Sequence, residues 1–123
     1  MLILLSPAKK LDFSEPDPAL PATERRFVED TASLAVTTRR QTQADLRKLM
    51  GISEDLARLN RERFQAFDAE ALDTGVQAAF AFAGDVYQGL EARTLDTDGL
   101  AFAQDHVRIL SGFYGMLRPL DRI

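Results

Sequence analysis

The sequence predicts a mixed α/β fold that is rich in helix and has a few short strands, near residues 2–6 and 107–111. First, both segments, LILLS and VRILS, are short apolar runs of the kind that forms buried strands. Second, segments between them place apolar residues three and four positions apart, which is typical of helices. Third, about a hundred residues separate the two strands, which favours a crossover connection and parallel pairing.

The first third of the chain is expected to hold one strand, one loop and one helix. Pro7 ends the strand, and residues 8–23 read as an extended loop because they are rich in proline. Thr23 is the expected N-cap of a helix over residues 24–40. The apolar stripe of that helix would comprise Phe27, Ala32, Leu34 and Ala35.

The middle of the chain predicts two consecutive helices, over residues 42–50 and 53–67, with Ser53 starting the second. Gly51 lies between them. The apolar spacing around this glycine is that of a helix-hairpin-helix-like unit of about residues 42–66, in which a tight turn exposes backbone amides at the start of the next helix.

The last third is expected to return from helix to strand. Residues 73–90 are expected to be helical through their alanine-rich part, with a break near Gly84. Residues 96–106 predict an amphipathic helix capped by Asp or Thr, and the strand at residues 107–111 follows directly.

Charge is unevenly distributed along the chain. The net charge is −4, but residues 39–63 carry seven basic residues against four acidic ones. One interpretation is a solvated helix face, and the other is an anion-binding surface. Because the basic segment coincides with the predicted hairpin, the anion of interest is a DNA phosphate, contacted without reading bases. The predicted DNA-binding residues are Arg47, Lys48, Gly51, Ile52, Ser53, Arg58, Arg61 and Arg63.

The hairpin pattern departs from its strong form at one position. Ser53 stands where a second glycine is usual, so the close approach of backbone to phosphate is less assured, although a serine there caps the helix. The alternative is two packed helices joined by a glycine C-cap.

A second candidate site lies where the two predicted strands end. Loops that leave the carboxyl ends of parallel strands line the ligand crevice of such sheets. The candidate anion pocket comprises Ser6, Lys9, Lys10, Ser111, Tyr114 and Arg118. In an enzyme acting on a phosphorylated or carboxylated compound, Lys9 and Arg118 would hold the anion and Tyr114 would donate a proton. Alternatively, the serines merely cap their strands and Arg118 pairs with Asp121 or Asp85.

Composition excludes several classes of chemistry. The chain has no cysteine and one histidine, His106, so it has no disulfides, thiolate metal sites or histidine cluster. We therefore assign no metal ligands, no cofactor and no catalytic residues, and we leave open whether the protein is an enzyme. The chain of 123 residues is expected to form a single domain. Its apolar runs are too short to span a bilayer and no basic segment precedes the first one, which predicts a soluble cytoplasmic protein.

Three ordered motifs carry a family resemblance. LILLSPAK, FAGDVYQGL and LSGFYGMLRPLD together resemble the YaaA family of bacterial peroxide-stress proteins. Departures are small: Lys10 stands where Thr is common, Ala83 where a lysine is frequent, and Phe113 and Met116 are apolar exchanges. Members of that family are about twice as long, so the resemblance implies a single partial domain over residues 1–123, the N-terminal half of such a protein.

The resemblance implies a function in the response to hydrogen peroxide. Such proteins keep unincorporated iron low and so limit oxidative damage to DNA. Similar proteins bind DNA through a helix-hairpin-helix and a positively charged cleft in a mixed α/β fold. The implied partners are DNA, bound without strong sequence preference, and the C-terminal half of the same protein. If packing against that half were the only role of this chain, much of residues 111–121 would be interface.

Overall fold

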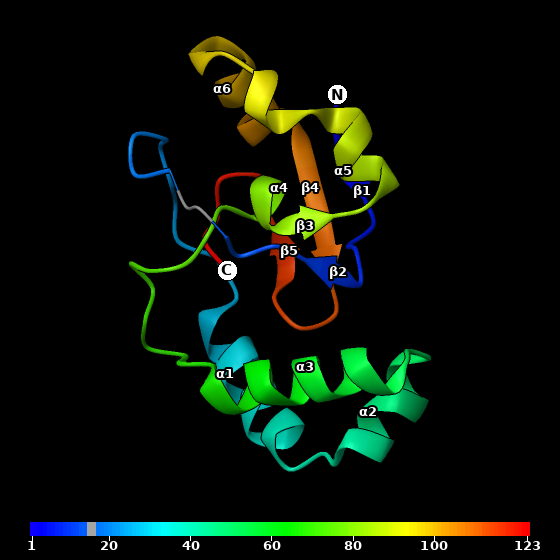
Figure 1. Cartoon of the computed structure of the whole chain (residues 1–123). Helices are drawn as coiled ribbons and strands as arrows, with labels where there is room; N and C mark the ends of the chain where they lie inside the picture. Colours follow the sequence, from blue (N-terminus) through cyan, green and yellow to red (C-terminus); the bar gives the residue numbers. More distant parts are fainter. Residues whose placement is uncertain (15–16) are drawn as a thin grey trace. The chain divides into compact units, whose positions relative to one another are not determined.

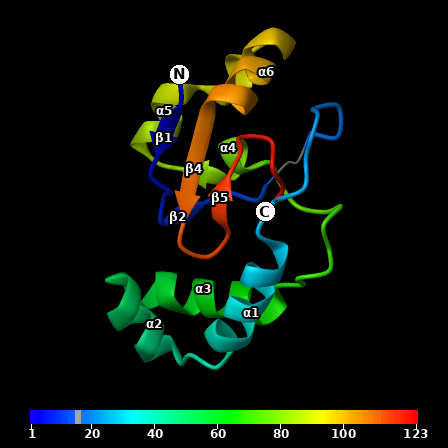
Figure 2. The same cartoon turned by 180° about the vertical axis from the view of Figure 1, so that it is seen from behind.

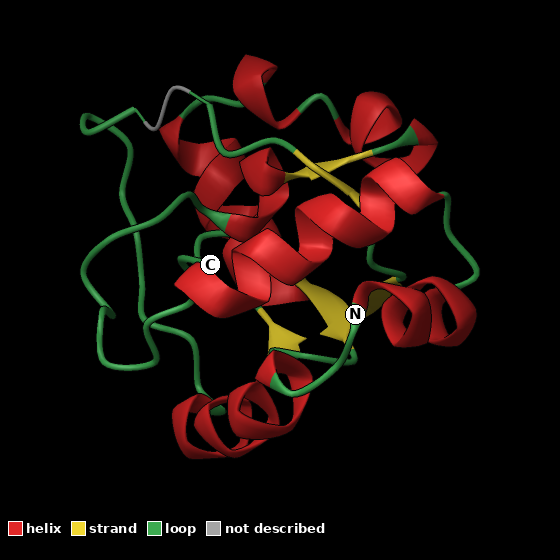
Figure 3. Cartoon of the chain, turned by 60° about the horizontal axis from the view of Figure 1, so that its bottom comes forward, coloured by secondary structure: helices red, strands yellow, loops and turns green. Residues whose placement is uncertain are grey.

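The computed structural model describes residues 1–14 and 17–123 (Figure 1). The chain divides into two compact units. Unit 1 comprises Met1–Val28 and Ala71–Ile123, and unit 2 comprises Glu29–Glu70. Helices outweigh the short strands along the chain (Figure 3), so the predicted mixed α/β, helix-rich class is confirmed.

Unit 1 is built on a three-stranded sheet, shown from behind in Figure 2. Its strands follow the order β1 (Ile3–Leu5), β4 (Val107–Ser111), β5 (Gly115–Leu117). The pairing of β1 with β4 is parallel, with Ile3 opposite Val107, and that of β4 with β5 is antiparallel. Both predicted strands and their parallel pairing are thus confirmed.

The other elements of unit 1 are short. A two-stranded antiparallel sheet joins β2 to β3, and three helices and one 3₁₀ turn complete the described part of the unit. Their bounds are β2 (Lys10–Leu11), β3 (Phe82–Ala83), α4 (Ala78–Ala81), α5 (Asp85–Leu90), η1 (Ala92–Thr94) and α6 (Thr97–His106). The strand β2 lies inside the predicted loop of residues 8–23, of which residues 15 and 16 lie outside the described part. The predicted cap of α6 is confirmed, because the carboxylate of Asp96 accepts a hydrogen bond from the amide of Gly99 at 2.8 Å.

One face of the sheet carries the core of unit 1. Side chains alternate between the two faces of a strand, and Ile109 and Leu117, which are opposite each other, are completely buried. They pack with Val76, Phe82 and Tyr87, and Leu5 packs against this cluster.

Two helix predictions in unit 1 are corrected by long-range pairing. Because Phe82 and Ala83 pair with β2, residues 73–90 form only one helical turn before β3, and α5 follows the predicted break at Gly84. At the start of that turn, the amides of Ala78 and Ala79 donate to the carbonyls of Asp121 and Pro119. The alanine-rich pattern does not reveal these partners, which are forty residues away.

Thr23 is not an N-cap. Its amide donates to the carbonyl of Leu120 at 2.8 Å, and its hydroxyl donates to the carboxylate of Asp121 at 2.6 Å. The helix therefore begins four residues later than predicted, at Val28.

The predicted apolar stripe of that helix is also wrong in part. The buried residues of α1 (Val28–Arg39) are Thr31 and Ala35, whereas Leu34 is exposed. Phe27 precedes the helix and packs on Gly115 of β5, where an added Cβ would lie 3.0 Å from its ring.

Unit 2 contains most of α1, followed by α2 (Gln43–Met50) and α3 (Glu54–Ala66). Thr42 and Asp45 form a capping box at the start of α2, since each side chain accepts a hydrogen bond from the backbone amide of the other. Leu46 of α2 and Ala57 of α3 are buried, as expected for two helices packed on each other. The predicted pair of helices is therefore confirmed.

Candidate nucleic-acid interface

The turn between α2 and α3 consists of three residues. Gly51 is in the left-handed conformation, with φ 60° and ψ 46°, which glycine adopts at little cost. The hydroxyl of Ser53 accepts a hydrogen bond from the amide of Leu56 at 3.3 Å and so caps α3. The C-cap glycine and the N-cap serine together make the tight connection that the sequence predicts.

The turn presents fewer amides than the sequence suggests. The amides of both Gly51 and Ile52 donate to the carbonyl of Arg47. The N–H groups available to an anion are therefore those of the first turn of α3, at Ser53, Glu54 and Asp55, which have no acceptor within the helix. Such a helix start favours negative charge, although two of its own residues are acidic.

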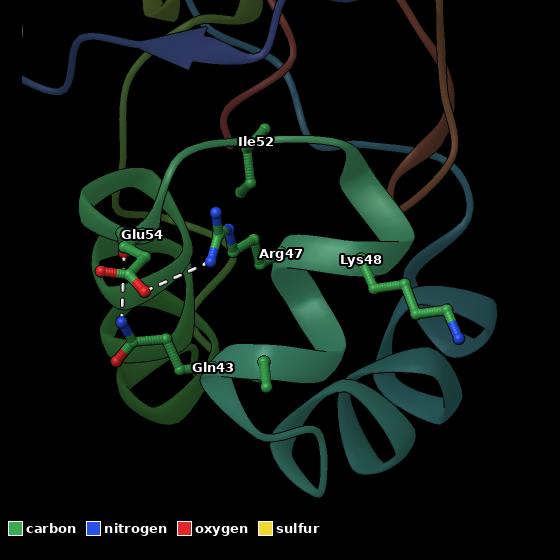
Figure 4. A pocket seen from close by; sticks show the side chains of 6 residues that line it. Gln43, Arg47, Lys48, Ile52 and Glu54 are labelled. Atoms are coloured by element: carbon green, nitrogen blue, oxygen red, sulfur yellow. Dashed lines mark hydrogen bonds and ion pairs between the residues drawn. The ribbon is translucent and has the colours of Figure 1, made fainter.

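A pocket of about 590 Å³ opens beside this turn, within unit 2 (Figure 4). Arg47 reaches toward Glu54, and the Nη1 to Oε1 distance is 3.2 Å, while Lys48 extends to the other side of the helix. The side-chain amide of Gln43 donates through Nε2 to the backbone carbonyl of Glu54 at 3.2 Å. The lining residues are Gln43, Ala44, Arg47, Lys48, Ile52 and Glu54.

The sequence did not identify three of these lining residues, Gln43, Ala44 and Glu54. Gln43 and Glu54 are not basic, so the charge pattern does not find them. Gln43 lies one helical turn before Arg47, and this spacing is the signal that would have found it. Glu54 is the first residue of α3, where acidic side chains are common for reasons of helix stability alone.

The ion pairs of the hairpin are weak. The side chains of Arg47 and Glu54 are 56% and 73% exposed, so their pair contributes about 0–1 kcal/mol. Arg58 lies 3.9 Å from Asp55 and 3.6 Å from Glu62, and all three side chains are exposed. A phosphate can therefore compete for either arginine.

The other basic residues of the segment differ in their exposure and in their bonding partners. Lys48 and Arg61 are exposed and form no ion pair with any residue that the structure describes. Arg63 is partly buried. Arg39 holds unit 2 together, because its guanidinium donates to the carbonyls of Phe64 and Phe67. Lys48, Arg61, Arg47 and Arg58 are thus the accessible cations of α2 and α3, called the hairpin cations below.

The residues of the predicted anion pocket are mostly engaged elsewhere. Arg118 forms an ion pair with the buried Asp121, at 2.8 Å between Nη2 and Oδ1, and it also donates to the carbonyl of Glu24 at 3.0 Å. The hydroxyl of Ser111 accepts hydrogen bonds from the amides of Phe113 and Tyr114 and closes the turn between β4 and β5. For both residues the structure follows the capping and pairing alternative.

The remaining residues of that set do not supply a continuous cationic surface. Ser6 accepts a hydrogen bond from the Tyr87 hydroxyl through its backbone carbonyl, and burial raises the pKa of Tyr87 to about 12. Lys9 and Lys10 are exposed. Tyr114 contacts Phe113 edge-on and lies under the guanidinium of Arg25.

A different pocket, of about 320 Å³, lies in unit 1 beside the FAGDVYQGL motif. Tyr87 and Gln88 of the motif line it together with Phe80 and Arg93. The guanidinium carbon of Arg93 lies 5.5 Å from the centre of the Phe80 ring. None of the six predicted pocket residues lines it.

Carboxylates do not gather into a metal site in the described part of the chain. Asp121 is held by Arg118, and the hydroxyl and amide of Ser14 keep the pKa of the exposed Asp12 below its usual value. Within residues 1–14 and 17–123, no three acidic or histidine side chains are arranged to hold a metal ion. No helix in these ranges is both long and apolar enough to cross a membrane.

Comparison with known proteins gives one consistent result. A family model described as Peroxide stress protein YaaA matches residues 1–123. The UPF0246 protein of Phenylobacterium zucineum is 63% identical over 123 residues, which are 100% of this chain and 46% of the relative. The UPF0246 proteins of Ruegeria pomeroyi and Caulobacter sp. are each 57% identical over the whole chain and 48% of their own length. The chain spans about half the length of these relatives and matches their N-terminal half.

Proposed function

The chain belongs to the Peroxide stress protein YaaA family, and we propose that it binds DNA without strong sequence preference and helps to limit free iron and oxidative DNA damage under peroxide stress. The observation that carries the DNA-binding part is the α2–α3 hairpin, a glycine turn and a capped helix start surrounded by the hairpin cations.

The hairpin is suited to the phosphate backbone rather than to bases. A phosphate oxygen at the start of α3 would accept hydrogen bonds from the free amides of the first turn. Arg47 would leave its exposed pair with Glu54, and Lys48 would contact a neighbouring phosphate. Contacts of this kind fix position on a duplex but carry no sequence information, so we propose binding that is nearly independent of sequence.

Charge supports the same location. The chain as a whole is acidic, with a net charge of −4, so attraction to DNA must come from a local surface. The segment of residues 39–63 provides the local excess of positive charge, and its hairpin cations are exposed.

Paired charge reversals test the location of the DNA surface. We expect Arg58→Glu with Arg61→Glu to weaken binding to a labelled duplex by about tenfold or more, because two phosphate contacts are replaced by repulsion. The matched control is Lys9→Glu with Lys10→Glu, which changes the charge equally on exposed residues of unit 1. Loss of binding only in the control pair would refute the hairpin proposal.

The iron part of the proposal rests on family membership and is tested separately. In bacteria carrying a full-length family member, we expect its deletion to raise chelatable iron during peroxide exposure, measured by electron paramagnetic resonance. Unchanged iron in the deletion strain would remove this part and leave the DNA-binding part standing.

The alternative, an enzyme or binding protein for a phosphorylated or carboxylated small molecule, has less support. Arg118 and Ser111 are engaged in an ion pair and a turn, so the anion pocket would retain mainly Lys9 and Lys10. Thermal stabilisation by such a compound that Lys9→Ala abolishes would restore this alternative.

A further inference from the structure

We infer that the uncovered face of the β1-β4-β5 sheet, together with the free edge of β1, is the surface that packs against the C-terminal half carried by the longer members of this family. This inference concerns unit 1 and is independent of the DNA-binding proposal.

Both faces of the sheet carry apolar side chains, but only one face is covered. On the covered face Val107 and Ile109 are buried. On the opposite face Leu4 is 57% exposed and Leu110 is 47% exposed. Figure 2 shows this side, where no helix of the described part of unit 1 crosses in front of β4. Strands of parallel pairs are normally covered on both faces, so this face lacks a layer.

Charge on the open face does not explain its exposure. Arg108 is opposite Leu4 in the register and would be the solubilising residue there. Its guanidinium instead donates to the carbonyls of Gln104 at 2.8 Å and Val107 at 2.7 Å. The guanidinium of Arg108 is thus bound at the end of α6, and Leu4 and Leu110 remain exposed on the open face.

The edge of the sheet at β1 is also open. Among the described residues, β1 pairs only with β4, so its other side presents free backbone amides and carbonyls. The preceding residues are apolar and exposed, with Leu2 at 57% and Met1 at 87%. An exposed apolar edge of this kind is a template for another strand.

The length of the relatives identifies the occupant. The C-terminal half of each relative lies outside the matched region, which is only 46–48% of its length. Residue 123, where the match ends, belongs to unit 1: the amide of Ile123 donates to the carbonyl of Val76 at 2.9 Å, and Val76 donates back at 3.1 Å. A chain that continues from this point is tethered to the unit with the open sheet, so its effective concentration there is high.

A chimera provides the test. It joins residues 1–123 of this chain to the C-terminal half of the Phenylobacterium zucineum relative, which is 63% identical over the shared part. By hydrogen exchange and mass spectrometry, we expect the backbone amides of residues 2–5 to exchange about tenfold or more slowly in the chimera than in the 123-residue chain.

Substitutions make the comparison specific to the open face. Leu4→Glu and Leu110→Glu should lower the Tm of the chimera by several degrees and leave that of the 123-residue chain nearly unchanged, because both leucines are exposed in the latter. Val36→Glu is the control, since Val36 is equally exposed but lies on α1 in unit 2. Equal exchange in the two proteins, or equal Tm changes, would overturn the inference. Protection of residues 2–5 in the 123-residue chain that grows with protein concentration would overturn it too, because a second copy would then be the occupant.

Discussion

The contacts that stabilise each of the two units differ in how far apart along the chain their residues lie. In unit 2 the contacts span shorter separations: the capping box of Thr42 and Asp45 is local, and Arg39 binds the carbonyl of Phe67 across 28 residues. In unit 1 they join the ends of the chain, because Thr23 bonds to Asp121 across 98 residues. Unit 2 exposes charge whereas unit 1 exposes leucines on a sheet. The difference suggests separate tasks, with the helical unit suited to an anionic partner and the sheet to more polypeptide.

The largest effect is expected from removing a long-range contact of unit 1. Asp121 is fully buried and accepts hydrogen bonds from Arg118 and Thr23. Asp121→Ala would remove the carboxylate partner of the Arg118 guanidinium and leave it the carbonyl of Glu24, which we expect to cost about 3–5 kcal/mol in the free energy of unfolding. Urea denaturation measures this cost, with Asp105→Ala, an exposed position on α6, as the control. Equal midpoints for the two variants would show that the ends of unit 1 do not depend on this contact.

The next effect tests the packing of unit 2. Leu46 is 1% exposed and Leu49, on the same helix, is 77% exposed. We expect Leu46→Ala to cost about 2–5 kcal/mol and Leu49→Ala almost nothing, since only the first leaves a cavity. Thermal unfolding followed by circular dichroism measures both. A large effect of Leu49→Ala would mean that α2 packs through the face that carries Leu49.

A pair of glycines compares turn and helix. Gly51→Ala places a side chain in the left-handed conformation and should destabilise the hairpin by about 1 kcal/mol. Gly89 lies in α5 with no atom within 4 Å of an added Cβ, so Gly89→Ala should be neutral or slightly stabilising. Chemical denaturation of both variants gives the sign, and the same sign for both would contradict the assignment of the turn.

The smallest effect concerns Glu54. If Arg47 contacts a phosphate as proposed, the carboxylate of Glu54 would compete for it, so Glu54→Gln should raise DNA affinity by about twofold to fivefold, in line with a weak exposed pair. Glu62→Gln is the control, because Glu62 pairs with Arg58 further along α3. Fluorescence anisotropy with a labelled duplex measures both affinities. Weaker binding by Glu54→Gln would mean that Glu54 holds Arg47 in place for DNA.

The sequence predicted the elements whose signals are local. Ser53 starts α3, the apolar run at residues 107–111 is β4, and its parallel pairing with β1 follows from the long connection. It misplaced the start of α1 because Thr23 has the properties of an N-cap, while its actual partner, Asp121, is 98 residues away.

The helices and turn that form the candidate site were predictable, but the contacts within them were not. The glycine turn and the basic residues are visible in the sequence. Periodicity cannot show that the backbone carbonyl of Arg47 accepts hydrogen bonds from the amides of Gly51 and Ile52. Nor can it show that the carboxylate of Glu54 pairs with the Arg47 guanidinium. Arg39 adds to the charge of the basic segment but is not one of the hairpin cations, since its side chain donates to backbone carbonyls within unit 2.

The most direct test of the central claim is the salt dependence of DNA binding by the 123-residue chain, measured with two duplexes of unrelated sequence. If the four hairpin cations contact phosphates, a plot of log Kd against log salt concentration should have a slope of about 3 to 4, the same for both duplexes. Binding that does not weaken with salt, or that requires one of the two sequences, would contradict a phosphate-directed hairpin.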